Sequence, residues 1–397
     1  MKLILINKFV LKSVPIYVFK GAVTIAYIPL LLVIYAISPF IKFRFGYISV
    51  DRIGHFAMDL AHIIAINKDK DKNTVNLYYL QGLISNKQLE TIAKRELNVY
   101  QICKYFVYAY ELIGLGSKVL LPNRHTNGSV NIDGATYHSK YDILLTSSEN
   151  KVAKSYMSRY GWTEGEKFVC LNVRDKAFFS DSETSRHAYR NSDIHDFEVA
   201  INYLLNLGYW VVRMGKKVEK PLGIKHDKLI DYGIDPNRSD LLDIWFCKNC
   251  DFFISTGTGI DAVALMFKKQ TLIANLLPIM DIIGWINGIT VPKRLFWNNG
   301  KELSLTEHLN NYYQDINIYK EKKIDIVSLT PDEIKSVVQE MVDRLNDIPL
   351  SDKQIQDQGK FWNILEHHES YGKFHGVRDP DASFGTSFLK NNPNFLS

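Results

Sequence analysis

Apolar residues follow two different spacings along the chain from residue 45 onward. Short continuous apolar runs predict buried strands, and apolar positions that recur every three or four residues predict helices. The predicted strands cover residues 45–50, 73–82, 166–175, 209–215, 251–255 and 271–278. The predicted helices cover residues 51–66, 85–97, 103–116, 192–208, 238–250, 260–266 and 330–345. Strands that alternate with helices in this way predict the α/β class, with doubly wound parallel sheets.

The length of the chain divides this pattern into two domains. A chain of 397 residues exceeds the size of one ordinary hydrophobic core. A polar stretch at 121–141 predicts an exposed loop shortly before the boundary. The expected organisation is an apolar anchor at 1–44, a first α/β domain at 45–150, a second at 151–348, and a C-terminal helix and tail at 349–397 that pack back on the domains.

One N-terminal segment departs from a soluble pattern. Residues 21–41 read GAVTIAYIPLLLVIYAISPFI without a charge, and Lys20 and Lys42 flank them. About 20 such residues suffice to cross a hydrocarbon core, but Pro29 would kink a spanning helix. Because basic flanks favour the cytoplasmic side, we expect a membrane-embedded or re-entrant helix on the cytoplasmic face of the inner membrane. A clean span and a buried soluble helix are the alternatives.

Charge and cysteine content narrow the possible partners. The net charge of +5 and pI near 8.7 fall short of a nucleic-acid-binding signature, but they suit anionic lipid or a phosphorylated substrate. Four cysteines include a lone C-x-x-C at Cys247 and Cys250. A single pair without a second at ligand spacing does not predict zinc. Nothing indicates a disulfide framework, which favours a reducing compartment.

The sequence DFFISTGTGID places five small residues between a predicted strand and a predicted helix. The turn consists of Ser255, Thr256, Gly257, Thr258 and Gly259. Backbone N–H groups at a helix N-terminus favour phosphate, and the hydroxyl groups add further donors. No Lys follows the last glycine, as a Walker sequence requires, and Ala262 holds the third place of G-x-G-x-x-G. The alternative interpretation is a plain strand-to-helix turn.

Charged residues stand at the ends of two predicted strands. LNVRD ends in Arg174 and Asp175, and VVRMG contains Arg213. Arginine suits bidentate recognition of phosphate, so two strand-end arginines beside the turn could form a diphosphate clamp. The alternative for each arginine is an ion pair that closes the domain. In HAYRNSD, three residues could bind substrate or merely precede a helix cap: Tyr189, Arg190 and Asn191.

The first domain offers one candidate for proton transfer. In DRIGHF, Gly54 and His55 stand at a predicted strand-to-helix turn. A histidine there can act as a general base or contact a substrate. A capping or packed histidine is the alternative.

Several segments together resemble a family of bacterial GT-B glycosyltransferases from surface-polysaccharide (O-antigen or capsule) loci. They are DRIGHFAMDL, YRNSDI, GYWVVRMG, RSDLLDIWFCKNCDFFISTGTGIDAVALMF and ASFGTSFLKNNPNFL, which span most of the chain after residue 45. The resemblance implies two Rossmann-like domains facing a cleft, an acceptor on the first domain and a sugar-nucleotide donor on the second. It places the donor diphosphate at the turn, with Asp261 near the sugar or ribose. Expected substrate contacts are Gly54, Tyr189, Arg190, Asn191, Arg238 and Ser239.

We therefore expect transfer of a sugar from a nucleoside-diphosphate donor to a polyprenyl-linked or growing surface glycan. His55 is the first candidate for the base and Asp175 the second, with the leaving diphosphate stabilised by Arg174, Arg213 and the turn. No cofactor is expected. No metal is expected either, since D-x-D occurs in the C-terminal half only as DPD in the tail. The absence of E-x-x-x-x-x-E near the turn favours inversion.

Three other functions stay open. A sugar-nucleotide epimerase or hydrolase of the same layout would leave the apolar segment unexplained. A non-catalytic membrane-tethered scaffold would keep the fold without turnover. A dehydrogenase ranks last, because DRIGHF replaces a glycine fingerprint after the first strand.

Overall fold

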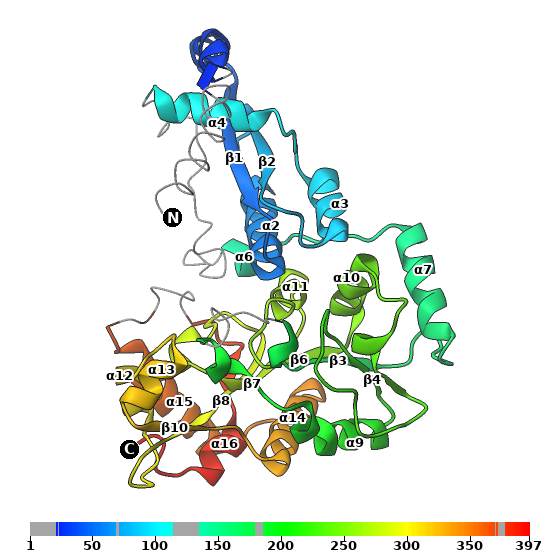
Figure 1. Ribbon diagram of the computed structural model, residues 1–397, viewed down its shortest axis with the longest axis vertical. Coiled ribbons are helices and arrows are strands. Elements are labelled where there is room, and N and C mark those ends of the chain that lie inside the picture. Colours follow the sequence, from blue (N-terminus) through cyan, green and yellow to red (C-terminus); the bar gives the residue numbers. More distant parts are fainter. Residues whose placement is uncertain are drawn as a thin grey trace, which may run out of the picture.

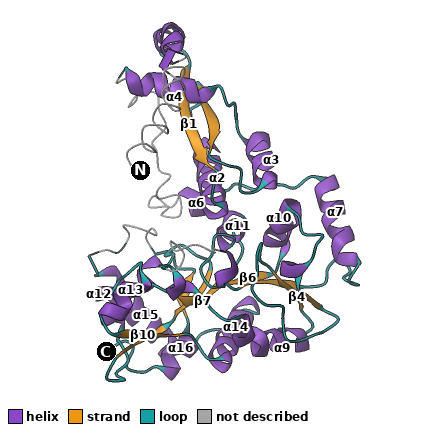
Figure 2. Cartoon of the chain, viewed as in Figure 1, coloured by secondary structure: helices purple, strands orange, loops and turns teal. Residues whose placement is uncertain are grey.

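Two lobes of unequal size stack along the longest axis of the computed structural model (Figure 1). The structure describes residues 21–22, 24–68, 71–113, 135–178, 186–369, 371 and 378–397. The smaller N-terminal lobe lies at one end and the larger C-terminal lobe at the other, and helices and strands alternate in both (Figure 2). The predicted α/β class is confirmed.

The C-terminal lobe is built on a seven-stranded parallel sheet. In spatial order its strands are β11 (Ala382–Phe384), β8 (Gly288–Pro292), β7 (Thr271–Leu276), β6 (Phe252–Ser255), β3 (Phe168–Asn172), β4 (Trp210–Arg213) and β5 (Leu229–Ile230). The strands β3, β4, β6 and β7 are buried along their whole length. Helices cover both faces of such a sheet, so its central strands read as continuous apolar runs.

Helices lie on both sides of this sheet, with α9 and α14 on one side and α10 and α11 on the other (Figure 1). The helices of the lobe are α7 (Ser147–Ser158), α9 (Glu198–Asn206), α10 (Asp240–Asn249), α11 (Asp261–Met266), α12 (Leu305–Asn310), α13 (Ile316–Glu321), α14 (Pro331–Leu345), α15 (Asp352–Glu366) and α16 (Thr386–Asn391). A small antiparallel pair, β9 (Arg294–Trp297) and β10 (Ile324–Val327), stands apart from the sheet. The tail, expected to pack back on the domains, supplies β11 at the sheet edge and α16.

The N-terminal lobe holds one parallel pair of strands within the described residues, β1 (Lys42–Ser49) and β2 (Thr74–Gln81). Its helices are α2 (Ile53–Lys68), α3 (Lys87–Glu96), α4 (Cys103–Leu112) and α6 (Ala135–His138). Side chains alternate across the pair, so Phe45 and Tyr79 pack toward α4, whereas Ile48 and Leu80 join the main core with α2. A full second Rossmann-like domain was expected, and the described residues show this smaller unit instead.

Residues 24–36, from the charge-free segment, form a helix that packs beside α4. Within the described part of the chain, no helix is both long enough and apolar enough to span a bilayer. Most of the predicted polar loop at 121–141 lies outside the described residues.

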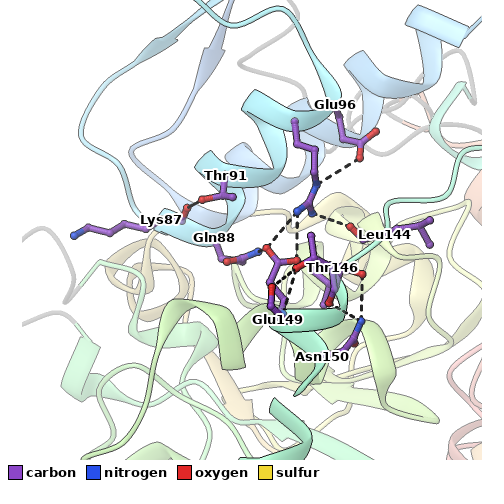
Figure 3. Close-up of polar contacts among 11 residues, drawn as sticks. Lys87, Gln88, Thr91, Glu96, Leu144, Thr146, Glu149 and Asn150 are labelled. Carbon is purple, nitrogen blue, oxygen red and sulfur yellow. Dashed lines mark hydrogen bonds and ion pairs between the residues drawn. The ribbon is translucent and has the colours of Figure 1, made fainter. Parts of the chain in front are cut away.

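Polar contacts join the two lobes beside α7. Figure 3 shows Gln88 of α3 directed at Glu149 of α7, with 2.7 Å between Nε2 and Oε1. Arg95 lies 3.2 Å from the same carboxylate and donates to the carbonyl oxygen of Leu144 at 2.7 Å. Glu149 also accepts a 2.6 Å bond from the N–H of Thr146, its own helix cap. The carboxylate of Glu149 therefore both caps the first turn of α7 and binds two side chains of the N-terminal lobe.

Candidate functional site

The small-residue turn lies where ligands bind in doubly wound sheets. The strand β3 has β4 on one side and β6 on the other, so the strand order reverses between β3 and β6. The crevice outside the carboxyl ends of strands at such a switch point is the usual ligand position. β3 ends at Asn172 and β6 ends at Ser255, the first residue of the turn. We call residues 255–259 the donor turn.

The donor turn is held in shape by its own side chains. Ser255 donates from Oγ to Oδ2 of Asp261 at 2.9 Å, and the N–H of Thr258 donates to the same oxygen at 2.6 Å. The N–H of Gly257 donates to Oγ of Ser255 at 3.1 Å. Gly257 has φ of +73°, which favours glycine. Burial raises the pKa of Asp261 above its usual value, although the hydrogen bonds from Thr258 and Ser255 oppose this change.

This arrangement corrects the prediction of bare backbone donors, because two of the N–H groups are already bonded within the turn. The helix that follows, α11, has only six residues and contributes little dipole. Ser255 and Thr256 are buried, whereas Gly257, Thr258 and Gly259 reach the surface. Gly257, Thr258 and Gly259 are therefore the accessible part of the turn, and any positive charge beside it must come from other residues.

That charge comes from two arginines that the structure brings to the turn. Arg174 follows β3, and its backbone N–H donates to Oγ1 of Thr256 at 2.9 Å. Arg190 donates from Nη2 to the carbonyl oxygen of Gly257. Asn191 accepts from Nε of Arg174 at 3.3 Å. Of the two strand-end arginines predicted to form the clamp, Arg174 lies beside the turn. Arg190 and Asn191, expected as substrate contacts, lie there with it.

Positive charge accumulates at this group. Burial, and then the charge of Arg190, lower the pKa of Arg174 to about 10. Burial and the charges of Arg190 and Arg174 also lower the pKa of His187. Two guanidinium groups held close together bind an anion favourably, since the anion reduces the repulsion between them. The turn and its arginines are therefore a candidate anion site.

Sequence reasoning missed two residues of the site. Asn172, at the end of β3, donates from Nδ2 to Oγ1 of Thr258 at 2.8 Å. Lys293, just after β8, is buried and donates from Nζ to the carbonyl oxygen of Asn191. Burial lowers the pKa of Lys293 to about 8. Asn172 could have been found as a polar residue closing an apolar run, whereas nothing near Lys293 in the sequence connects it to the turn.

Arg213 differs from the predicted clamp. Its side chain is 1% exposed. Nη1 donates to Asp231 at 2.8 Å and Nη2 to the carbonyl oxygen of Lys220 at 2.9 Å. Both terminal nitrogens are thus used inside the lobe, and the alternative interpretation of a domain-closing ion pair fits the structure.

Three predicted substrate contacts are also structural. Ser239 accepts from the N–H of Leu242 at 3.2 Å and caps α10. Arg238 donates from Nη2 to both carboxylate oxygens of Asp243, with both distances 3.0 Å. Tyr189 is buried against Tyr319 in a separate apolar cluster. A capping role, a paired charge and a core position explain these residues without a ligand.

The candidate bases differ in their surroundings. Gly54 lies in the first turn of α2, where a Cβ would stand 3.1 Å from Cα of Gly259. The backbones of the two lobes therefore touch, and half-buried His55 is the next residue. Asp175 accepts from the N–H groups of Ala177 at 2.9 Å and Glu219 at 2.8 Å, so its carboxylate organises two loops.

The described residues contain no group of three or more His, Cys, Asp or Glu side chains arranged to hold a metal ion. Their four cysteines are buried free thiols.

No protein-family model matches the chain, and no curated protein matches it. Among solved structures, the glycosyl transferase family 9 protein of Veillonella parvula is similar, with 10% identity, a TM-score of 0.46, and 77% of this chain and 99% of that one covered. ADP-heptose LPS heptosyltransferase II of E. coli has 10% identity, the same coverage and a TM-score of 0.40. MnaA of S. aureus with UDP has 12% identity, covers 59% and 79%, and has a TM-score of 0.30. Similarity of this size does not determine chemistry, which has to be argued from the site.

Proposed function

We propose that the protein is a glycosyltransferase that binds the diphosphate of a nucleotide sugar at the donor turn and transfers the sugar to an acceptor hydroxyl at the N-terminal lobe. The observation that carries the proposal is the cluster of Arg174, Arg190 and Asn191 at the switch-point turn, where Arg190 donates to the carbonyl oxygen of Gly257. A diphosphate would neutralise this cluster, and the glycines of the turn would allow its close approach.

The chemistry follows from where charge develops. As the bond between sugar and diphosphate breaks, negative charge grows on the leaving group. Arg190 and Arg174 would stabilise that charge, so the proposal requires no metal ion. His55 would accept the proton of the attacking hydroxyl, because Gly54 brings it beside Gly259 of the donor turn. Asp175 is the weaker candidate, since backbone N–H groups occupy both its carboxylate oxygens.

We propose a lipid-linked or growing surface glycan as the acceptor. The support is the charge-free segment at 21–41, whose helix lies in the same lobe as His55. The donor base follows from the experiment below.

The first experiment is a calorimetric titration with UDP, ADP, GDP and inorganic pyrophosphate. A hydrogen bond to a charged group contributes about 1.5–3 kcal/mol, so Arg190→Ala should weaken binding about 10- to 100-fold. Arg186→Ala is the matched control, because Arg186 stands in the same segment with its side chain on Asp315 at 2.9 Å, and it should bind as the parent does. Failure of every nucleotide to bind, or equal losses in both variants, would refute the anion site.

Turnover is tested with sugar derivatives of the nucleoside diphosphate that this panel identifies. His55→Gln should keep the parent's nucleotide affinity and lose release of nucleoside diphosphate from the sugar donor. A variant that retains full turnover would exclude His55 as the base. Nucleotide binding without any sugar transfer or hydrolysis would favour the scaffold alternative.

A further inference from the structure

The helix at 24–36 has one buried face and one exposed face, and both are apolar. Its inner face, with Tyr27, Ile28, Leu31 and Ile34, packs into an apolar cluster with β1 and α4. Its outer face and the turn that follows expose side chains that are 40–77% accessible to solvent. These exposed side chains, which we call the apolar end, are Ile25, Leu30, Leu32, Val33, Tyr35, Ile37, Phe40 and Ile41.

The apolar end contains no charge. A surface helix normally carries charged residues on its outer face, and a helix that is apolar all round is found in a core or in lipid. Monomeric soluble proteins rarely expose large contiguous apolar patches, and such patches mark interaction sites. Something apolar therefore covers this face in the working protein.

The charges in the first 50 residues of the sequence favour a lipid surface as the partner that covers the apolar end. The first 50 residues contain six basic and no acidic side chains. Two of them, Lys42 and Arg44, begin β1 directly after the apolar end. Basic residues beside an exposed apolar face are the combination that binds an anionic bilayer surface, at about 1 kcal/mol for each Lys or Arg. A second copy of the same surface would instead bring like charges together.

The arrangement of the N-terminal lobe determines how far the donor turn lies from the apolar end. The helix at 24–36 and α4 lie across one end of β1, at the extremity farthest from the C-terminal lobe (Figure 1). β1 runs from Lys42 at this end to Ser49, and Gly54 then meets the donor turn. Eight residues at about 3.3 Å each span roughly 23 Å.

We propose that the apolar end docks in the interface of an anionic bilayer, with the helix at 24–36 lying in the membrane plane, and that β1 holds the donor turn roughly 23 Å away from the lipid. This inference concerns the partner and the orientation of the protein. It stands on the exposed apolar face and its basic border, and it does not depend on which reaction the site performs.

Vesicle co-sedimentation tests the docking. The full chain should bind phosphatidylcholine vesicles that contain phosphatidylglycerol, and bind less to phosphatidylcholine alone. Leu32→Glu with Val33→Glu removes two half-exposed apolar groups and adds two negative charges, so binding should weaken about 100-fold. Leu207→Glu with Ile355→Glu is the matched control, on the C-terminal lobe with similar exposure, and it should bind as the parent does.

Labelling tests the orientation. The four native cysteines are buried, so a cysteine placed on the surface takes an environment-sensitive dye selectively. On vesicles, a dye at Phe40→Cys should shift to the blue, and one at Leu83→Cys should not. Leu83 is 87% exposed and follows the end of β2 nearest the donor turn. Shifts at both positions would overturn the upright orientation, and no shift at either would overturn docking.

Two further outcomes keep this inference separate from the proposed function. If the double glutamate variant converts a dimer to a monomer and vesicles do not bind, the apolar end is an interface between copies and the inference is wrong. If vesicles bind but no nucleotide does, the transferase proposal fails and the docking stands. A far-UV circular dichroism spectrum and a urea unfolding midpoint equal to those of the parent show that the variant is folded.

Discussion

The contact between Gly54 and Gly259 offers a sharp test of how the two lobes meet. In Gly54→Ala the new Cβ would stand 3.1 Å from Cα and 3.2 Å from the carbonyl oxygen of Gly259. Both atoms belong to backbone, which cannot rotate away as a side chain does. The two turns must therefore move apart by several tenths of an ångström to reach ordinary contact.

The free energy has two parts of opposite sign. Ala is favoured over Gly in a helix by about 1 kcal/mol, and overpacking costs about 1–3 kcal/mol. Gly359→Ala isolates the first part, because Gly359 lies within α15 and its new Cβ would meet nothing within 4 Å. The free energy of unfolding of Gly54→Ala should therefore fall about 1–3 kcal/mol below that of Gly359→Ala.

Urea unfolding measures this difference, and steady-state turnover measures its effect on the site. A displacement near 1 Å can cost about 100-fold in rate, so Gly54→Ala should lower kcat about 10-fold with nucleotide affinity unchanged, whereas Gly359→Ala keeps the parent's kcat. Equal stabilisation by both substitutions, with full activity, would show that the lobes do not meet through these glycines in solution.

The remaining predictions concern two buried cations. Arg213→Met should lower the free energy of unfolding by about 3 kcal/mol, because it leaves Asp231 without its buried partner, while the folded variant binds pyrophosphate normally; weakened pyrophosphate binding would restore the clamp interpretation. Lys293, with its pKa lowered to about 8 by burial, loses its charge as the pH rises through that value. Pyrophosphate affinity should fall over that range, and Lys293→Met should remove this component in calorimetric titrations; an unchanged profile would place Lys293 outside the site. The effect of pH on the free energy of unfolding has the opposite sign, because burial favours the neutral amine of Lys293. The ordinary pKa is 10.5, so the stability contributed by the neutral amine is complete above pH 10.5 and is lost as the pH falls through about 8.

The core strands were predictable because parallel strands buried on both faces form continuous apolar runs. Segments FVCLN, WVVR, FFIS and TLIANL all satisfy that rule and became β3, β4, β6 and β7. The strands β5, β8, β9, β10 and β11 were missed. Each has two to five residues, too few for a pattern to develop, and β11 pairs with β8 only because the tail returns to the sheet edge.

The site was predictable to the extent that it is local in sequence. The five residues of the donor turn and Arg174 stand at strand ends, and a parallel sheet brings the carboxyl ends of its strands to one edge. The sequence alone therefore determined the α/β class, the donor turn and the charge-free N-terminal helix, since each depends on neighbouring residues and their spacing.

The tertiary structure decided which charges serve the turn. Arg174 and Arg213 look alike as strand-end arginines, but β3 adjoins β6, whereas β4 lies on the far side of β3 beside β5. Arg213 consequently meets Asp231, and Arg190 meets Gly257. Strand order and long-range packing set these partners. They also place Lys293 beside Asn191 and leave one face of the N-terminal helix uncovered. The sequence could not predict these contacts, because they join residues whose separation along the chain follows no periodic pattern.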